Sequence, residues 1–292
     1  MKICMHNWMR PEPLEVTLAR LNRLGYDGIE IMGEPRKYDV KEVRGLLDKY
    51  KIECWGSVTI MVAGRDLIHA DPYFREMSLQ YVIECIDLVA ALDGKILTLV
   101  PSEVGKIIAM SDPETEWAWA VEGIKKAADH ANKKGVRIGL EPLNRFETNF
   151  LNRHDQAIRL AQDVGEGVGV CLDAFHIFIE EADPYQAILD TGSMLVDFHV
   201  ADNNRFPPGS GCFDWKKIIS TLGQAGYDTY LTSEFVVPLD RSPLNIKDEA
   251  AGTEASDAEL KFIRDHGSDL MSEARYSKYV EDTIKHLKAN GA

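Results

Sequence analysis

The chain has 292 residues, of which 45% are hydrophobic and 27% are charged, a composition typical of a soluble globular protein. Its formal net charge of −14 argues against nucleic acid or an anionic membrane as a partner, because both are negatively charged. No apolar stretch approaches the roughly 20 residues that a membrane-spanning helix needs, and the N-terminus has no signal-peptide pattern, so we expect a cytoplasmic protein.

Eight short apolar runs predict β-strands, and helical patterns fill the intervals between them. The expected strands span residues 2–6, 28–32, 52–58, 95–100, 136–141, 168–173, 195–200 and 229–234. Parallel strands need a crossover connection, usually a helix, so this alternation predicts a parallel sheet. We predict a closed (β/α)8 TIM barrel rather than a doubly wound open sheet, because eight units fit it and polar residues crowd the C-terminal strand ends.

Several of the expected helices carry start and stop signals. Asp71-Pro72 and Asp183-Pro184 each supply a cap followed by a proline at the first helical position. The best specified helix follows Ser111, which has the spacing of a capping box with Glu114, and it ends at Gly135. Further helices are expected to begin near Pro13, Asp39, Trp215 and Glu273.

Nothing in the sequence divides the chain, so we expect one domain over residues 1–292. Residues 236–271 are rich in Asp, Glu, Ser and Pro, and they predict a long loop with a short helix after the eighth strand. No Gly-x-Gly-x-x-Gly follows the first strand, so a dinucleotide site has little support. The five cysteines are scattered, form no Cys-x-x-Cys pair, and are expected to be small buried residues in a reducing compartment.

Four candidate metal ligands stand at the ends of the last four expected strands. They are Glu141, Asp173, His199 and Glu234. In a parallel barrel these strand ends meet at one mouth, so residues far apart in the sequence converge on one point. Three carboxylates and an imidazole make a hard, oxygen-rich site that suits a divalent cation.

Each of these residues also has a simpler interpretation. Glu141 is a surface acid in its simpler interpretation, although the run before it is apolar and Pro142 ends the strand abruptly. In the simpler interpretations of the other two, Asp173 caps the following helix and His199 is a core histidine with satisfied hydrogen bonds. Strand alternation places Asp197 on the same face as His199, where a barrel usually has branched apolar residues. The four residues together favour the metal site.

Three aromatic residues are weaker candidates for the same pocket. His6 ends the first strand and is a candidate for the pocket lining. Trp8 and Trp55 lie near the ends of the first and third strands. They are either stacking platforms for a sugar or packing at the rim.

Such a centre suits proton transfer next to a carbonyl group. A cation with few open positions accepts a carbonyl and its neighbouring hydroxyl, and as a Lewis acid it stabilises an enediolate. Glutamates on opposite sides then exchange protons on both faces, which is epimerisation, whereas use of one face gives isomerisation. Metal-dependent hydrolysis is the general alternative, but one histidine with three carboxylates points to a single hard ion. The intact ligand set disfavours a non-catalytic binding barrel, and the net charge disfavours an endonuclease.

Several motifs together resemble one known family. They are Glu141-Pro-Leu-Asn-Arg-Phe-Glu147, Asp173-x-x-His176, His199-Val-Ala-Asp-Asn-Asn-Arg205 and the final strand-end glutamate, Glu234. With these motifs the chain resembles the D-tagatose 3-epimerase / D-psicose 3-epimerase family of xylose-isomerase-like TIM barrels. The resemblance spans nearly the whole chain and is sharpest from about residue 136 to residue 235.

The resemblance implies roles for individual residues. The metal ligands would be Glu141, Asp173, His199 and Glu234, with Mn²⁺ as the first candidate ion and Co²⁺ or Mg²⁺ as alternatives. Glu141 and Glu234 would form the acid/base pair at C3 of a ketose. The residues in contact with substrate hydroxyls would be Glu147, His176 and Arg205. The resemblance also implies a homodimer or homotetramer.

One stretch departs from the family pattern and leaves the reaction open. After the last glutamate the ketose epimerases usually carry a glycine-rich stretch and a Trp-Arg-Asp segment, whereas Phe235-Val-Val-Pro-Leu-Asp-Arg241 follows here. Because this stretch borders the expected pocket, a lyase or dehydratase that acts on an oxidised sugar is the alternative. An example is the catalytic subunit of a C-glycoside deglycosidase, which adds a small partner subunit.

Overall fold

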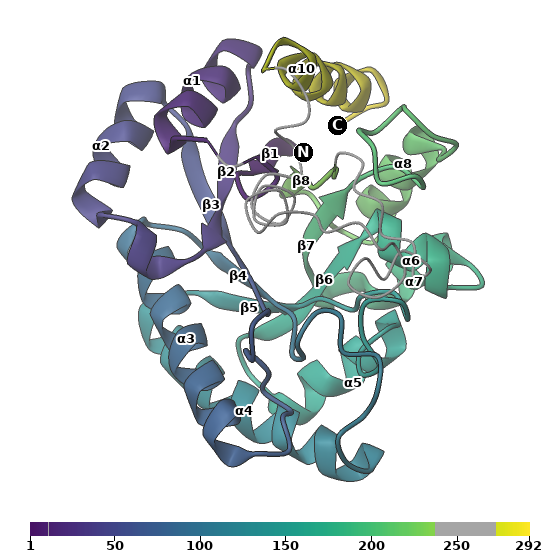
Figure 1. The fold of residues 1–292 in the computed structure, drawn as a ribbon. Helices are drawn as coiled ribbons and strands as arrows, with labels where there is room; N and C mark the ends of the chain where they lie inside the picture. The colour runs from purple at the N-terminus through teal and green to yellow at the C-terminus, as the bar shows by residue number, and fades with distance from the viewer. Residues whose placement is uncertain (11, 237–272) are drawn as a thin grey trace, which may run out of the picture.

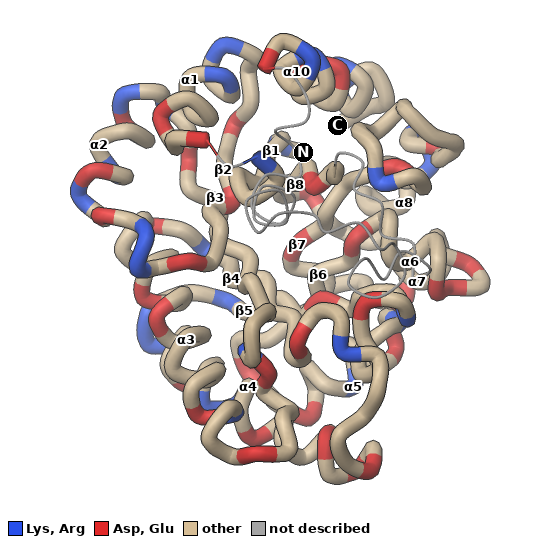
Figure 2. The backbone as a smooth tube through the Cα atoms, viewed as in Figure 1, with Lys and Arg blue, Asp and Glu red and all other residues tan. Residues whose placement is uncertain are grey.

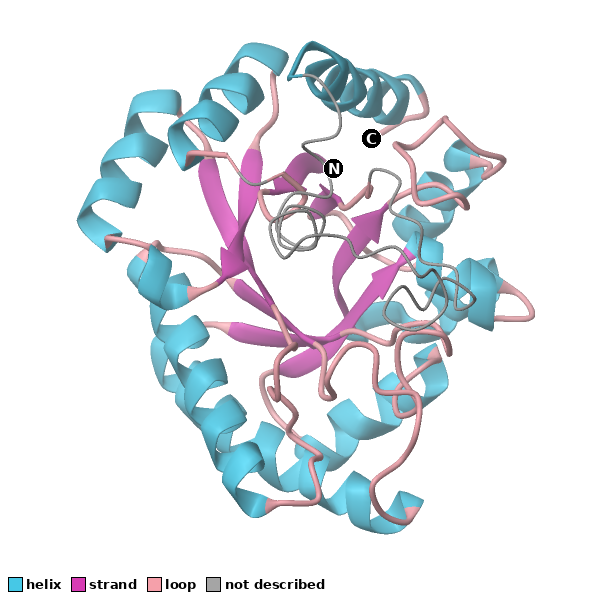
Figure 3. Ribbon diagram, viewed as in Figure 1, coloured by secondary structure: helices cyan, strands magenta, loops and turns pink. Residues whose placement is uncertain are grey.

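The computed structural model describes residues 1–10, 12–236 and 273–292. Eight strands form one parallel sheet that closes on itself in sequence order, and helices surround it (Figures 1 and 3). The strands are β1 (Lys2–His6), β2 (Gly28–Gly33), β3 (Glu53–Thr59), β4 (Ile96–Leu99), β5 (Arg137–Leu140), β6 (Val168–Asp173), β7 (Leu195–Val200) and β8 (Tyr230–Ser233). The predicted TIM barrel is therefore confirmed.

Closure joins the first strand to the last one. β1 pairs with β2 on one side and with β8 on the other, where Met5 lies opposite Ser233. Two neighbouring strands bring a pair of candidate ligands to the same level, because Asp173 on β6 lies opposite His199 on β7. A closed parallel sheet directs all its C-terminal strand ends to one mouth, so the side chains that follow the strands face a common space.

The helices form the outer ring, and most of them begin near the expected residues. They are α1 (Leu14–Leu24), α2 (Val40–Tyr50), α3 (Pro72–Ala91), α4 (Pro113–Lys134), α5 (His154–Val164), α6 (Ala174–Glu180), α7 (Pro184–Thr191), α8 (Trp215–Gln224) and α10 (Glu273–Ala289), with short 3-10 helices at Pro35–Lys37 and Gly192–Met194. Asp71 and Asp183 cap α3 and α7 as expected.

The cap of α4 differs from the expected one. Asp112 is the N-cap, and its carboxylate accepts a hydrogen bond from the backbone N–H of Thr115 at 2.9 Å. The predicted capping box of Ser111 and Glu114 is wrong, because Pro113 is the first helical residue and a side chain at 112 is the one that reaches the third helical N–H.

The strands are apolar except at a small number of buried polar positions. These positions include Glu30, Thr98, Asp173, Asp197, His199 and Thr232, none of which is exposed. Buried polar groups on barrel strands need partners, because an unpaired group costs free energy. These buried polar side chains therefore mark the barrel interior as the place to look for a functional site.

The outer surface carries charges of both signs, and acidic segments also lie inside the ring of helices beside β7 and β8 (Figure 2). All five cysteines are free, and Cys4, Cys85 and Cys171 are buried. Within the described ranges, no helix has the length and apolar character needed to cross a bilayer. The predicted loop and helix at 236–271 lie outside the described residues, apart from Val236.

Candidate metal centre

The four candidate ligands meet at the mouth of the barrel. Glu141 and Glu234 each follow directly after a strand, Asp173 is the last residue of β6, and His199 lies within β7. All four side chains are buried, with exposed fractions of at most 4%. One ligand atom from each of the four lies within 4.8 Å of the others. The fold therefore brings together four residues that are up to 93 positions apart, from 141 to 234.

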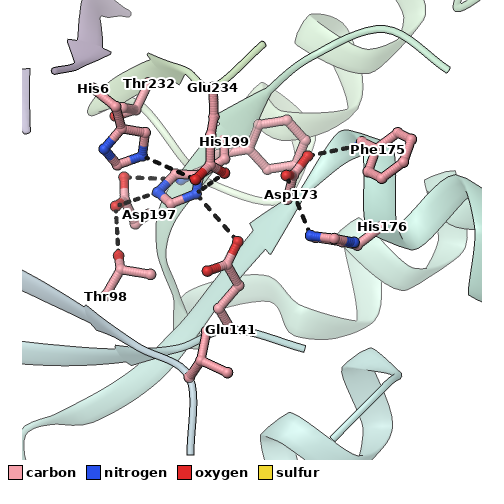
Figure 4. A network of polar contacts seen from close by, with 12 residues as sticks. His6, Thr98, Glu141, Asp173, Phe175, His176, Asp197, His199, Thr232 and Glu234 are labelled. Atoms are coloured by element: carbon pink, nitrogen blue, oxygen red, sulfur yellow. Dashed lines mark hydrogen bonds and ion pairs between the residues drawn. The ribbon is translucent and has the colours of Figure 1, made fainter. Parts of the chain in front are cut away.

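The imidazole of His199 stands at the centre of the group (Figure 4). Its Nδ1 atom lies 3.0 Å from a carboxylate oxygen of Glu234 and 3.3 Å from one of Glu141. Asp173 uses one oxygen to cap α6 by accepting a hydrogen bond from the Phe175 N–H at 2.7 Å. Capping and ligation are therefore compatible, because the second oxygen of Asp173 stays unused by the helix.

Electrostatics set the protonation of these acids in the absence of a cation. Burial raises the pKa of Glu141, and the Glu234 carboxylate adds to that effect. Burial also raises the pKa of Asp173 well above its usual value, again with help from Glu234 and Glu141. For Glu234, burial acts to raise the pKa, but the imidazoles of His199 and His6 outweigh it and hold the pKa below its usual value. The two imidazoles thus keep Glu234 ionised, whereas for Glu141 and Asp173 burial and the neighbouring carboxylates outweigh the nearby positive groups and raise the pKa.

The donor set fits a divalent cation. Among the described residues, Glu141 Oε1 and Asp173 Oδ2 are buried oxygens without a hydrogen-bond donor. A cation satisfies such oxygens and removes the repulsion between the carboxylates. Three carboxylates with one imidazole match the preference of ions such as Mn²⁺ and Mg²⁺ for oxygen-rich sites.

The three expected substrate contacts lie beside this group. Arg205 donates to Glu147 at 2.6 Å, and its guanidinium lies 4.7 Å from the ring centre of Phe175. His176, on the first turn of α6, has its Nε2 atom 3.7 Å from a carboxylate oxygen of Asp173. The structure thus places both halves of the predicted site next to each other.

The tautomer of His176 follows from its contacts. Burial, together with the nearby Arg205, lowers the pKa of His176 to about 3, so the imidazole is neutral at pH 7. Its Nδ1 atom faces the backbone N–H of Asn144 at 3.2 Å and the side-chain amide of Asn144 at 2.8 Å, so Nδ1 is the acceptor. The proton is therefore on Nε2, which has no hydrogen-bond partner among the described residues and points a donor toward the candidate site.

The loop that carries Arg205 is held from behind by Asp202. The Asp202 carboxylate accepts hydrogen bonds from the N–H groups of Gly209 and Phe213 and from the indole of Trp215. Arg205 itself has a φ of 58°, an unfavourable value for a residue with a side chain, and its backbone N–H donates to the Asp202 carbonyl at 2.8 Å. These contacts fix the direction of the Arg205 side chain.

One buried group near His199, Glu30, was not predicted as a site residue. Glu30 on β2 has no exposed surface, and its signal in the sequence is an acid within the apolar run from Gly28 to Met32. Trp8 donates from its indole N–H to Glu234 at 3.2 Å. His6 packs edge-on against His199, with ring centres 4.7 Å apart, as expected for a residue of the pocket lining.

The interpretation of Trp55 as a residue of the mouth is wrong. Trp55 lies near the start of β3, and its ring stacks on Tyr230, the first residue of β8, with ring centres 4.4 Å apart. Both residues therefore belong to the opposite end of the barrel from the ligands. The indole N–H of Trp55 reaches inward and donates to Asp197 at 3.1 Å.

Comparison with known proteins agrees with this architecture. The family model described as "Xylose isomerase-like TIM barrel" matches residues 18–266. The chain belongs to this family.

Several relatives of this xylose isomerase-like barrel carry names of sugar epimerases. The D-psicose 3-epimerase of Agrobacterium fabrum is 30% identical over 223 residues, which cover 72% of this chain and 75% of the relative. The 3-dehydro-D-guloside 4-epimerase of Escherichia coli is 26% identical over 236 residues, which cover 77% and 87%. A crystal structure of D-psicose 3-epimerase with D-tagatose from Clostridium cellulolyticum H10 superposes with a TM-score of 0.82 at 23% identity and covers 99% of each chain. The chain is thus a member of the barrel family that is similar to sugar epimerases.

Proposed function

We propose that this chain is a divalent-metal-dependent epimerase that inverts C3 of a ketose. The observation that carries the proposal is the buried convergence of Glu141, Asp173, His199 and Glu234 within 4.8 Å. The similarity to ketose 3-epimerases supplies the substrate class. Mn²⁺ is the first candidate ion, with Co²⁺ and Mg²⁺ as alternatives, and when bound it supplies the Lewis acidity that stabilises an enediolate.

Glu141 and Glu234 are the proposed acid/base pair. They extend from β5 and β8, with the two other ligand strands between them around the mouth, so they approach a bound ketose from different sides. Their surroundings move their pKa values in opposite directions, upward for Glu141 and downward for Glu234. Such a split is typical of an acid that gives a proton and a base that takes one. In one direction Glu234 therefore removes the C3 proton and Glu141 returns one to the other face, and in the reverse direction the roles exchange.

The neighbouring residues are proposed to hold the sugar hydroxyls. The free Nε2–H of His176 donates to a hydroxyl, and Glu147 accepts from another. Arg205, fixed by its loop and by Glu147, adds charge-assisted donors. Three directional contacts at one side of the centre position C3 between the two glutamates.

We also propose a homodimer or homotetramer. Large apolar side chains are exposed on the segments that follow β3 and β4, including Tyr73 at 64%, Ile107 at 58% and Ile108 at 76%. Exposed large apolar side chains that are neighbours in the chain, such as Ile107 and Ile108, are candidates for an association surface. A second copy of this chain is the proposed partner for this surface.

An oxidised sugar is the second candidate substrate. The relative from Escherichia coli is named for a 3-dehydro-glycoside, and it aligns with 77% of this chain. The same base next to a keto group also starts the loss of water or of an aglycone, as in a dehydratase or in the catalytic subunit of a C-glycoside deglycosidase. That version of the proposal adds a small partner subunit. The sequence departure after Glu234 that favours it lies outside the described residues beyond Val236.

A panel of ketoses and keto-glycosides with added Mn²⁺, followed by proton NMR in D₂O, tests the proposal. Inversion at C3 with uptake of deuterium supports the epimerase, whereas loss of water or an aglycone selects the second candidate. Glu141→Gln and Glu234→Gln should remain folded and lose exchange by roughly 10²–10⁴-fold, the usual size of general acid–base catalysis.

The matched control is Glu116→Gln, another buried glutamate, which accepts from the N–H of Met110 and lies outside the centre. This variant should exchange deuterium as fast as the wild type. Full exchange in both Glu141→Gln and Glu234→Gln would remove these residues from proton transfer.

A further inference from the structure

Two buried carboxylates lie on the far side of His199 from the candidate metal position. His199 presents Nδ1 to Glu141 and Glu234, and its other nitrogen, Nε2, lies 3.4 Å from Asp197 Oδ2 and 3.6 Å from Glu30 Oε2. Asp197 and Glu30 have no exposed surface. Figure 4 shows Asp197 beside the imidazole, with Thr98 beyond it. We call Asp197 and Glu30 the carboxylate floor.

Donors from several strands hold the floor in place. The Asp197 carboxylate accepts from the Thr98 hydroxyl on β4 at 3.1 Å, from the Trp55 indole on β3 at 3.1 Å and from the backbone N–H of Phe198 at 3.0 Å. Glu30 accepts from the Thr232 hydroxyl on β8. A carboxylate bound by donors from three strands has a fixed direction. The direction of Asp197 toward Nε2 is therefore set by the barrel and not by His199.

In a metal-bound histidine, one imidazole nitrogen binds the cation and the other carries the proton. A nitrogen that binds a cation needs a free lone pair, so in a metal-bound neutral imidazole the proton is on the other nitrogen. A lone pair on Nε2 would face the carboxylate oxygen of Asp197 and be repelled by it. A proton on Nε2 is attracted by the same oxygen, and in known metal sites such a partner fixes the orientation of the ligand histidine.

We propose that Asp197, supported by Glu30 and held by Trp55, is a positioning residue that keeps the Nε2–H of His199 directed at the floor and Nδ1 directed at the cation. This inference rests on the proposed function, because it takes His199 to be a metal ligand. It assigns a role to Trp55, which lies at the end of the barrel opposite the mouth. The support for the metal centre thus extends through the barrel by way of Trp55, Asp197 and His199.

The spacing of Glu30, Asp197 and His199 also permits a cation in the floor itself. The two arrangements differ in stoichiometry. A positioning floor gives one Mn²⁺ per chain, whereas a cation in the floor gives two. A stoichiometry of two would overturn the inference.

Calorimetric titration of Mn²⁺ into the metal-free chain is the first test. Wild type should bind one ion, and Asp197→Asn should bind it about 10–100-fold more weakly, the usual cost of losing such a partner. Trp55→Phe should weaken binding in the same direction but less, because Asp197 keeps its contacts with Thr98 and Phe198. Equal affinity of folded Asp197→Asn and wild type would contradict the inference.

Asp66→Asn is the matched control. Asp66 is a buried aspartate paired with Lys106 at 2.6 Å, and it lies outside the floor and the ligand set. Its substitution should leave Mn²⁺ affinity unchanged. A loss as large as that of Asp197→Asn would show that binding merely follows general loosening of the barrel, and the positioning role would be wrong.

A spectroscopic measurement reads the tautomer of His199 in the wild type itself, and a variant serves only to assign its signals. In ¹⁵N-labelled protein loaded with diamagnetic Mg²⁺, the imidazole signals of His199, assigned with His199→Gln, should report Nε2–H and an unprotonated Nδ1. Protonation on Nδ1 in the loaded protein would overturn the inference. Wild type that binds no cation would instead contradict the proposed function, so the two failures are distinguishable.

Discussion

The two ends of the barrel treat charged groups in different ways. At the N-terminal end of the strands, Lys2 pairs with Glu53 at 2.6 Å, and the N-terminal amine lies 3.5 Å from Asp228, with three of these four groups well exposed. At the mouth, the ligand set is buried and includes oxygens without hydrogen-bond donors. Exposed pairs contribute about 0–1 kcal/mol each, whereas a buried unsatisfied group costs about 1–3 kcal/mol. The N-terminal end of the strands, called the lower end below, thus adds slightly to the free energy of unfolding, whereas the unsatisfied groups at the mouth reduce it.

This difference shows where the molecule has polar atoms that a ligand could satisfy. Under the proposed function, the buried oxygens at the mouth that lack hydrogen-bond donors are the atoms that bind the cation. The lower end has no such requirement among its described pairs, because Lys2 and Glu53 satisfy each other and Tyr230 joins them. Variants at the two ends should therefore separate effects on activity from effects on stability.

The largest effect is expected from Arg205→Met. It removes the ion-pair partner of Glu147, whose side chain is 18% exposed, and loss of such a charged contact typically costs about 2 kcal/mol or more, so kcat/KM should fall by about 30-fold or more. The measurement is the epimerisation rate with the best ketose of the panel. Arg145→Met is the control, since Arg145 is 64% exposed and pairs with Glu180 outside the centre. Equal losses in both variants would break the distinction between the mouth and the surface.

The next effect is the stabilisation of the whole barrel by a cation. Mn²⁺ at 100 times its Kd should add about 2.7 kcal/mol to the free energy of unfolding, and a chelator should remove that gain. Asp173→Asn keeps a residue that caps α6 but removes a buried charge, so this variant should be at least as stable as wild type without metal and should gain less with it. Thermal melts without and with Mn²⁺ measure the metal-free stability and the gain on metal binding. A lower stability of metal-free Asp173→Asn would contradict the electrostatic cost assigned to the mouth.

A smaller, pH-dependent effect is expected from His154, which has a complete pair near the start of α5. Its hydrogen bond to Glu181 at 2.8 Å raises the pKa of the imidazole above the usual 6.5. The stability from this pair is fully present below pH 6.5 and is lost as the pH rises through the folded-state pKa. His154→Gln should therefore cost about 1 kcal/mol at pH 5.5 and less at pH 8.5, as measured by urea unfolding. The same loss at both pH values would show that the charge of His154 is not involved.

The smallest effect is expected from Lys2→Met at the lower end. Because Lys2 and Glu53 are both about half exposed or more, the variant should cost less than about 1 kcal/mol in urea unfolding. Its kcat/KM should equal that of wild type. A fall in kcat/KM without a fall in stability would connect the lower end to the reaction and would remove the contrast between the ends.

The sequence was sufficient for the architecture and for the four candidate ligands, for one physical reason. Parallel strands place their C-terminal ends at one mouth, so an acid after an apolar run, such as Glu141 or Glu234, has a predictable position once eight strands are counted. For Asp173 the interpretation as a helix cap is confirmed, and the residue also lies in the four-residue cluster, whose role as a metal site stays a prediction.

Three other features could not be predicted, because they depend on strand register, position within a strand or backbone geometry, which the alternation of strands and helices in the sequence does not specify. Glu30 was missed because its direction depends on the pairing of β2 with β3, whose register shifts between Ile29 and Glu30. Trp55 was assigned to the wrong end because its distance from the strand start, and not its membership of a strand, decides which opening it faces. Ser111 and Asp112 are both good capping residues, and only the backbone geometry selects between neighbours.

Closure of β8 between β7 and β1 has a consequence for the order of events during synthesis. Glu234 follows the last strand, so a growing polypeptide has only three of the four ligands until nearly all of the barrel has left the ribosome. An incomplete chain therefore lacks one of the four candidate ligands. Under the proposed function, binding of the ion is then a late step that follows closure of the barrel.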